Sequence, residues 1–156
     1  MAATWVQPKY FEDLGVGDKF TTAGRTVTEC DIVHFYMLSG AFEELFTNRE
    51  FVEKESIFKR RIAQGPLTLI ISLGLGVQLG YLHGTIMAFL GMDQMRVPRP
   101  VFENDTIHME VEVIDKRESK THSDRGIVTT RNTVLNQRNE PVLYYNHSVM
   151  IRRRPA

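Results

Sequence analysis

The stretch RIAQGPLTLIISLGLGVQLGYLHG, from Arg61 to Gly84, decides the fold of this chain. Pro66 suits the first turn of a helix, where its missing N–H has no intrahelical partner, and Gly65 lies just outside that turn. From Leu67 to Leu82 the residues are apolar on nearly every helical face, which predicts a helix buried on most of its sides. The segment is too short and too often interrupted by glycine for a membrane span.

The sequence after this helix is typical of β-strands. In TIHMEVEVI (106–114), apolar and polar residues alternate, with Ile107, Met109, Val111 and Val113 on one side. GIVTTRNTVLNQ and VLYYNHSVMIR are also rich in β-formers, and earlier strands are expected at 19–27 and 85–91. A long apolar helix followed by an antiparallel meander predicts an α+β hot-dog fold, in which a curved antiparallel β-sheet is wrapped around a long central helix.

A second helix is predicted before the long one. Thr28 and Asp31 have the spacing of a capping box, and Gly40 is placed to end the helix. The segment from Gly40 to Arg61 has no clear periodicity and is expected to be irregular.

The composition is that of one ordinary globular domain, 1–156, with 42% hydrophobic and 24% charged residues. The formal net charge is zero, which argues against a nucleic-acid partner or an anionic membrane surface. The N-terminus has no basic segment followed by an apolar run, and Cys30 is the single cysteine, so a cytoplasmic protein without disulfides is expected. The five histidines show no metal-ligand spacing, and no metal site is predicted.

Four segments together resemble the MaoC-like hydratase/dehydratases of the R-specific enoyl-CoA hydratase type. They are DLGVGDKF (13–20), TVTECDIVHFYMLSG (26–40), SIFKRRIAQGPL (56–67) and RVPRPVFENDTIHMEVEVIDKRES (96–119). The resemblance covers about the whole chain and implies a dimeric hot-dog protein that acts on acyl-CoA thioesters. Members of this family typically add water reversibly across a 2,3-enoyl-CoA double bond.

The resemblance breaks at the acid–base motif of the family, Gly-Asp-x-Asn-Pro-x-His. Gly40 matches the glycine, but Ala41 stands at the Asp position and Phe46 at the His position. Neither side chain can exchange a proton with water or with the α-carbon of a substrate. Glu43 and Glu44 follow the lost Asp closely and are the candidate replacement catalysts. A carboxylate desolvated by nearby aromatic side chains has a raised pKa that suits a general base. Alternatively, both are solvent-facing loop charges.

The candidate substrate-binding residues lie on both sides of this motif. By resemblance, the backbone N–H of Gly65 is a candidate oxyanion donor at a helix N-terminus, or Gly65 is only a turn residue. Gln64 replaces a frequent histidine of the family and has an amide that can hydrogen-bond a thioester or substrate carboxylate, or cap the loop. Phe42 and Phe46 suggest a pocket shaped for an apolar or aromatic acyl group.

Arg60 and Arg61 are candidates to contact the phosphates of coenzyme A, or they belong to a solvated turn. Coenzyme A would enter only as part of the substrate, and no separate cofactor is expected.

Two functions remain open from the sequence. One is an acyl-CoA hydratase/dehydratase with a shifted acid–base set. The other is a non-catalytic acyl-CoA-binding subunit that works with an active partner chain. A hot-dog thioesterase is disfavoured, because residues 67–82 contain no carboxylate. An exposed strand edge predicts a homodimer or larger oligomer, and a heteromer with an active homologue is the alternative.

Overall fold

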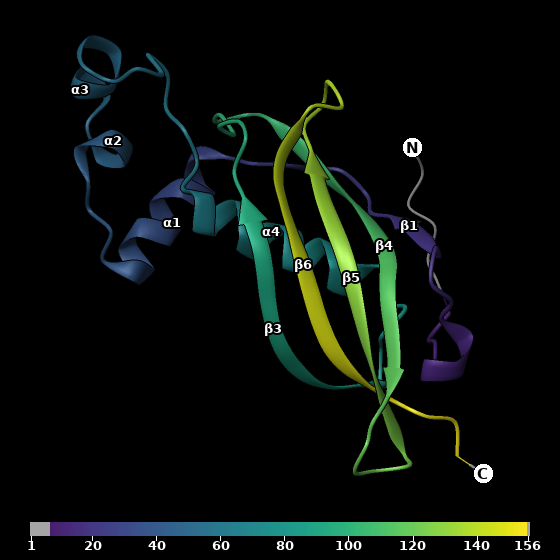
Figure 1. Ribbon diagram of the computed structural model, residues 1–156. Coiled ribbons are helices and arrows are strands. Elements are labelled where there is room, and N and C mark those ends of the chain that lie inside the picture. Colours follow the sequence, from purple (N-terminus) through teal and green to yellow (C-terminus); the bar gives the residue numbers. More distant parts are fainter. Residues whose placement is uncertain (1–6, 156) are drawn as a thin grey trace.

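The computed structural model describes residues 7–155. A short 3₁₀ turn, η1 (Phe11–Asp13), comes first in this part of the chain (Figure 1). The helices are α1 (Glu29–Ser39), α2 (Glu44–Thr47), α3 (Arg49–Lys54) and α4 (Gly65–Gln78). The strands are β1 (Lys19–Thr21), β2 (Arg25–Thr26), β3 (Ile86–Arg96), β4 (Thr106–Glu118), β5 (Arg125–Leu135) and β6 (Pro141–Arg152).

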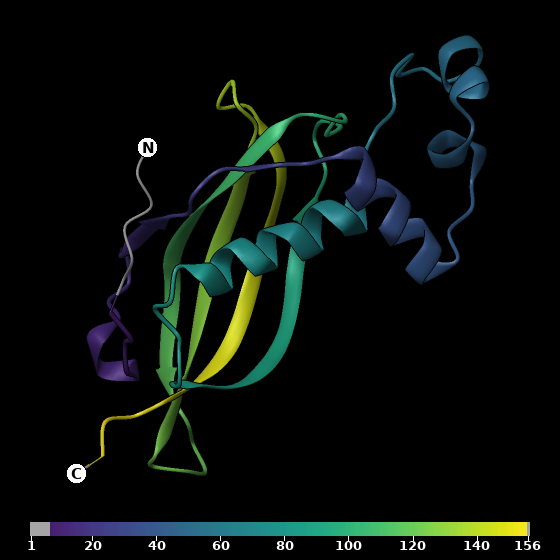
Figure 2. The same ribbon diagram turned by 180° about the vertical axis from the view of Figure 1, so that it is seen from behind.

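The strands form one antiparallel sheet in the order β1-β4-β5-β6-β3, and β2 also pairs with β4. The sheet is curved, and α4 lies across its concave face (Figure 2). This arrangement confirms the predicted α+β hot-dog fold. The strand expected at 19–27 is divided into β1 and β2, and the one expected at 85–91 extends to Arg96. Within residues 7–155, strand β3 has one neighbour, β6, and its other edge is free.

The core lies between α4 and the sheet. Ile107, Met109, Val111 and Val113 of β4 are all buried, as their alternation predicts. Leu67, Ile71 and Leu75 of α4 pack into the same hydrophobic cluster from the helix side. Their spacing of four residues places them on one helical face.

The expectation that α4 is buried on most sides is wrong for the single chain. Ile70 is 54% exposed and Val77 is 80% exposed, and Gly74 between them is exposed as well. These three residues form a stripe along the helix face that points away from the sheet. The sequence predicted a helix that is apolar on nearly every side. Composition does not reveal whether the residues that pack against those sides belong to the same chain or to another.

Helix α1 begins and ends as predicted. The Thr28 hydroxyl accepts the Asp31 N–H while the Asp31 carboxylate accepts the Thr28 N–H, which is a complete capping box. Gly40 ends the helix with a φ of +75°, in the left-handed region where a side chain is disfavoured.

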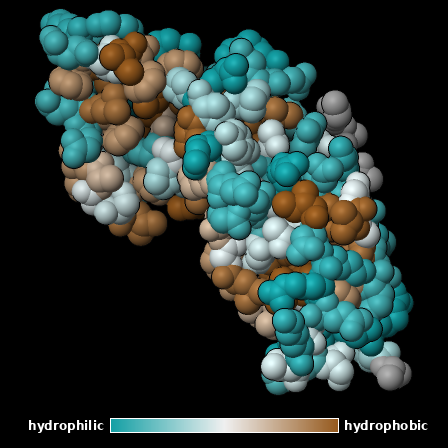
Figure 3. Space-filling view, in the orientation of Figure 1, coloured by the Kyte–Doolittle hydropathy of each residue, from teal (hydrophilic) through white to brown (hydrophobic). Residues whose placement is uncertain are grey.

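Helices α1, α2 and α3 form a lobe, residues 29–60, that projects beyond one end of the sheet (Figures 1 and 2). The Glu29 carboxylate binds Arg49 of α3, with Nη2 at 2.7 Å, and also binds Arg61 just before α4. Hydrophobic surface gathers on this lobe, whereas the outward face of the sheet is mostly hydrophilic (Figure 3). Met37, Leu38, Phe42 and Ile57 are exposed there.

No helix within residues 7–155 is long and apolar enough to span a membrane.

Candidate functional site

The N-terminal end of α4 is held firmly against the segment that leads into β4. The Ala63 N–H donates to the Val101 carbonyl at 2.8 Å, and Ile62 forms an isolated antiparallel bridge with Phe102. The Gln64 carbonyl accepts the first α-helical hydrogen bond, from Thr68 N–H at 3.0 Å. Helix α4 therefore starts from a fixed point, with its first N–H groups free of intrahelical partners.

Gln64 is the most unusual polar side chain at this end of the helix. Gln64 is only 4% exposed, and neither its Oε1 nor its Nε2 has a hydrogen-bond partner among residues 7–155. It precedes the helix as the N-cap residue, but its side chain makes no capping hydrogen bond. A buried amide without partners typically costs about 1–3 kcal/mol of stability, so this position is unfavourable unless something else binds there.

The backbone of the single chain does not require a glycine at position 65. Its φ does not lie in the left-handed region, and a Cβ placed on it would be 3.7 Å from Val97 Cγ2, an ordinary contact. The structure therefore gives no steric reason for glycine at this position. That observation weakens the alternative in which Gly65 is only a turn residue.

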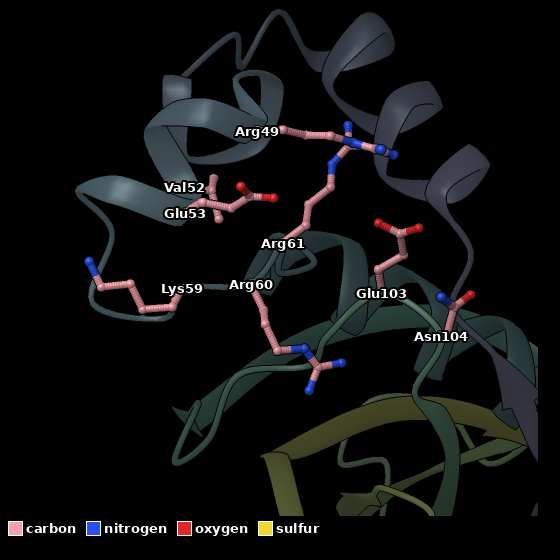
Figure 4. Close-up of a pocket in the computed structure, with 8 residues that line it drawn as sticks. All are labelled: Arg49, Val52, Glu53, Lys59, Arg60, Arg61, Glu103 and Asn104. Carbon is pink, nitrogen blue, oxygen red and sulfur yellow. The ribbon is translucent and has the colours of Figure 1, made fainter.

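A basic pocket of about 310 Å³ lies between the lobe and the segment before α4 (Figure 4). Four cationic side chains line this pocket, namely Arg49, Lys59, Arg60 and Arg61. The rest of the lining consists of Val52, Glu53, Glu103 and Asn104. Arg49 and Arg61 already share the Glu29 carboxylate, and Lys59 Nζ donates to the Lys54 carbonyl at 2.7 Å. Among the described residues, Arg60 is therefore the lining cation whose charge is available to an anion.

The two arginines predicted to bind phosphate differ in their surroundings. Arg60 is exposed, and its guanidinium lies 4.4 Å from the centre of the Phe102 ring. Arg61 is largely buried and already pairs with Glu29, while its Nε donates to the Phe46 carbonyl at 3.2 Å. The Arg61 hydrogen bond, followed by that of Arg49, lowers the pKa of the Glu29 carboxyl. Arg60 is therefore the freer of the two to meet a ligand.

Glu43 and Glu44 lie at the start of α2 and are both exposed. The Glu44 carboxylate accepts a hydrogen bond from Asn48 Nδ2 at 3.0 Å. The desolvation that would favour a general base is absent around both side chains in the single chain.

The predicted aromatic pair is only partly buried. Phe42 is 59% exposed, and its ring centre lies 5.5 Å from that of Tyr36. Phe46 and Ala41 are both half-buried. The Phe46 carbonyl accepts a hydrogen bond from Arg61, which holds this part of the lobe in place. These residues belong to the lobe and leave part of their apolar surface uncovered.

A groove of about 450 Å³, which the sequence does not predict, lies at the other end of α4. His147 of β6 lines it together with Tyr145 and Asn132. The sequence predicts that His147 lies at the surface or at an interface; in the structure its side chain lies half-buried on the helix-facing side of the sheet. The alternation of β6 indicates this inward position, because Tyr145, Val149 and Ile151 on the same face of the strand are all buried.

Within residues 7–155, no three His, Cys, Asp or Glu side chains gather in the manner of a metal site.

Comparison with known proteins gives matches along most of the chain. A family model described as "MaoC like domain" matches residues 13–136. The solved structure of a monoamine oxidase regulatory protein from Archaeoglobus is 41% identical, with a TM-score of 0.86. That match covers 97% of this chain and 99% of the other.

Two curated proteins are similar over part of their length. Protein MaoC of Klebsiella aerogenes is 36% identical over 115 residues, which are 73% of this chain and 32% of that protein. Mesaconyl-CoA hydratase of Cereibacter sphaeroides is 29% identical over 94% of this chain and 42% of its own. The chain thus spans less than half the length of both.

Proposed function

Because this chain belongs to the family of MaoC-like hydratase/dehydratase domains, we propose that it binds an acyl-CoA thioester at the N-terminal end of α4. A relative that matches nearly the whole chain is a hydratase of a CoA ester, which supports this class of ligand. Any addition or removal of water by this chain would then rest on Glu43 or Glu44, because Ala41 and Phe46 have no acid–base function.

The observation that carries the proposal is the buried and unpaired amide of Gln64. It lies beside the first turn of α4, where the backbone N–H groups and the helix dipole favour negative charge. A thioester oxygen held by the Gly65 N–H would receive the charge stabilisation that hydration chemistry needs. Pro66 has no N–H, so Gly65 and Leu67 are the residues of this turn that can donate.

The basic pocket supports the coenzyme A part of the proposed ligand. It is lined by Lys59, Arg60 and Arg61, which are separated from the Ala63-Gln64-Gly65 segment by one residue. Guanidinium groups are well suited to phosphate oxygens, since they donate two parallel hydrogen bonds. A phosphate in this pocket and a thioester at Gly65 would place the charged and the reacting parts of one ligand on neighbouring segments of the chain.

The second candidate is a non-catalytic acyl-CoA-binding subunit that is completed by an active homologue. The exposed positions of Glu43 and Glu44 favour it, because neither carboxylate is desolvated as a general base would be. In this candidate the thioester site remains and the acid–base groups come from the other chain.

A binding and turnover experiment separates the two candidates. The protein is titrated by calorimetry with enoyl-CoA and 3-hydroxyacyl-CoA esters, both aliphatic and aromatic, and the enoyl thioester absorbance is followed. If Glu43 or Glu44 is the base, Glu43→Gln or Glu44→Gln is expected to lower kcat about 10²-fold or more with little change in affinity. Glu50→Gln is the matched control, since Glu50 is an exposed glutamate of the same lobe that pairs with Lys54.

Binding without turnover in the unmodified protein would favour the non-catalytic subunit. Absence of binding to every ester would reject both candidates.

We also propose that two copies, or this chain and a homologue, associate through α4 and β3. The stripe of Ile70, Gly74 and Val77 lies uncovered on α4, and Ile86 and Phe89 are exposed on β3 beside its free edge. A long unpaired edge next to apolar surface favours pairing with another chain. Light scattering should therefore give at least twice the monomer mass, and Val77→Glu should lower it. A wild-type monomer at micromolar concentration would contradict this assembly.

A further inference from the structure

The Glu29 carboxylate binds two of the four cations that line the basic pocket, and it uses one oxygen for both. Glu29 Oε1 accepts a hydrogen bond from Arg49 Nη2 at 2.7 Å and another from Arg61 Nη1. The two guanidinium groups therefore lie next to one another, as Figure 4 shows. No donor within residues 7–155 hydrogen-bonds the second oxygen, Oε2. Neither arginine makes with Glu29 the two parallel hydrogen bonds that a guanidinium group forms with a well-matched anion.

The two arginines differ in how firmly they are held. The Arg61 side chain is only 10% exposed, and its Nε also donates to the Phe46 carbonyl at 3.2 Å. The Arg49 side chain is 64% exposed, and among the described residues it hydrogen-bonds only to Glu29. Arg49 is therefore the arginine whose guanidinium group can leave Glu29 while the rest of the lobe stays in place.

The ion pair between Arg49 and Glu29 is one that an incoming anion can replace. The Arg61 hydrogen bond, followed by that of Arg49, lowers the pKa of Glu29, so its carboxyl group is ionised at pH 7. Both members of the pair are nevertheless exposed, and such pairs contribute little to stability because water solvates the separated charges well. A diphosphate carries more than one charge and accepts parallel hydrogen bonds from a guanidinium group. It is therefore a stronger partner for Arg49 than the Glu29 carboxylate.

We propose that Glu29 is an internal competitor of the anionic ligand, and that a diphosphate group entering the basic pocket displaces it from Arg49. Glu29 keeps its bond to Arg61 in this exchange. The diphosphate then has two guanidinium groups in the pocket, those of Arg60 and Arg49, instead of Arg60 alone. The proposal rests on the function proposed above, because the diphosphate is that of coenzyme A, and it specifies what limits affinity at that end of the ligand.

Repulsion between like charges gives the physical reason for an internal competitor. Arg49 of α3 and Arg61 before α4 carry the same charge and lie against one oxygen. Without an anion between them, their repulsion would destabilise the contact between the lobe and the start of α4. Glu29 supplies that anion, but a ligand must break its pair with Arg49 before binding there. Removal of the Glu29 charge should therefore tighten anion binding, whereas removal of a carboxylate that only supports the pocket would weaken it.

The test measures the affinity of inorganic pyrophosphate and of acyl-CoA esters by titration calorimetry. Pyrophosphate has the charge of a diphosphate but no acyl, pantetheine or adenine group, so it reports on the pocket alone. Glu29→Gln is expected to bind pyrophosphate about tenfold tighter than the wild type, the effect of one added hydrogen bond to a charged group. Thermal melting verifies that the variant folds. In the wild type, the ¹⁵Nε NMR signal of Arg49, assigned by its absence in Arg49→Gln, should shift when pyrophosphate is added.

Two further variants show whether the gain comes from the released arginine. Glu50→Gln is the matched control, because it removes a carboxylate from another exposed ion pair of the lobe and releases Lys54, which does not line the pocket. It should leave the affinity for pyrophosphate nearly unchanged. Arg49→Gln should have little effect in the wild type, where the new contact offsets the lost pair with Glu29. In the Glu29→Gln background it should abolish the tenfold gain.

The expected result is tighter pyrophosphate binding in Glu29→Gln that depends on Arg49, together with a shifted Arg49 signal in the wild type. Absent, unchanged or weaker binding in Glu29→Gln, a gain that persists without Arg49, or an unshifted Arg49 signal would overturn the proposal. If pyrophosphate shows the expected pattern while no acyl thioester binds, the competition by Glu29 stands and the acyl-CoA function fails. If acyl-CoA binds but Glu29→Gln changes the affinity for neither ligand, the function stands and the competition fails.

Discussion

Replacing Gln64 by methionine is expected to raise the melting temperature and, at the same time, to weaken acyl-CoA binding. The Gln64 amide is buried with both of its polar atoms unpaired. Methionine has a similar length and no strong hydrogen-bonding group, so the variant avoids a desolvation cost of about 1–3 kcal/mol. For a domain of this size that corresponds to about 3–10 °C. Affinity should fall about tenfold, since one ligand hydrogen bond is lost.

Gln78→Met is the matched control for this substitution. Gln78 is the last residue of the same helix and is exposed, so the same chemical change should leave melting temperature and affinity nearly unchanged. Differential scanning calorimetry and titration calorimetry measure the two effects. A Gln64→Met protein that is less stable than wild type would show that the amide has a structural partner. Unchanged affinity would remove Gln64 from the binding site.

Replacing Gly126 by alanine is expected to destabilise the protein strongly. A Cβ on Gly126 would lie 2.3 Å from Cδ2 and Cε2 of Phe11, which real side chains essentially never approach so closely. The Phe11 ring is 4% exposed and also lies under the Lys116 ammonium, 4.5 Å from the ring centre. The ring has little room to move, so we expect a loss of about 1–3 kcal/mol from overpacking. Chemical denaturation of the variant measures this loss directly.

A double-mutant cycle with Phe11→Ala identifies the cause. Phe11→Ala alone should cost about 3–5 kcal/mol, because a large buried ring is removed. In that background the alanine at position 126 has space, and Gly126→Ala should then cost little. Strictly additive free energies of unfolding would mean that the two residues do not clash and that Gly126 is needed for another reason.

Much of the fold follows from local patterns in the sequence. The alternation of β4 predicts a strand with one buried face, because only that conformation buries all of its apolar residues together. The spacing of Thr28, Asp31 and Gly40 predicts a helix with a cap at each end. The irregular course of β3 was not predictable in this way. Its register against β6 shifts three times, and Gly91 and Gln94 have positive φ values that a period of two does not encode.

The candidate site was harder to predict than the fold. The Ala63-Gln64-Gly65 segment could be placed at a helix start, but the lack of partners for Gln64 depends on every residue packed around it. For Glu43 and Glu44 the sequence left open both a catalytic and a solvent-facing position, since α2 and α3 are too short for a periodic signal, and both side chains are exposed in the structure. The alternation of β6 places His147 on the inward face, but the groove beside it depends on side chains of α4 and β3 that are distant in the sequence.

The order of the elements along the chain has a consequence for biosynthesis. Helix α4 and strand β3 are made before β4, β5 and β6, yet β3 pairs only with β6 in this sheet. During translation the apolar helix therefore leaves the ribosome before the strands that cover it exist. The nascent chain must keep this helix and an unpaired strand from aggregating until β6 has emerged, which is the situation in which chaperones bind.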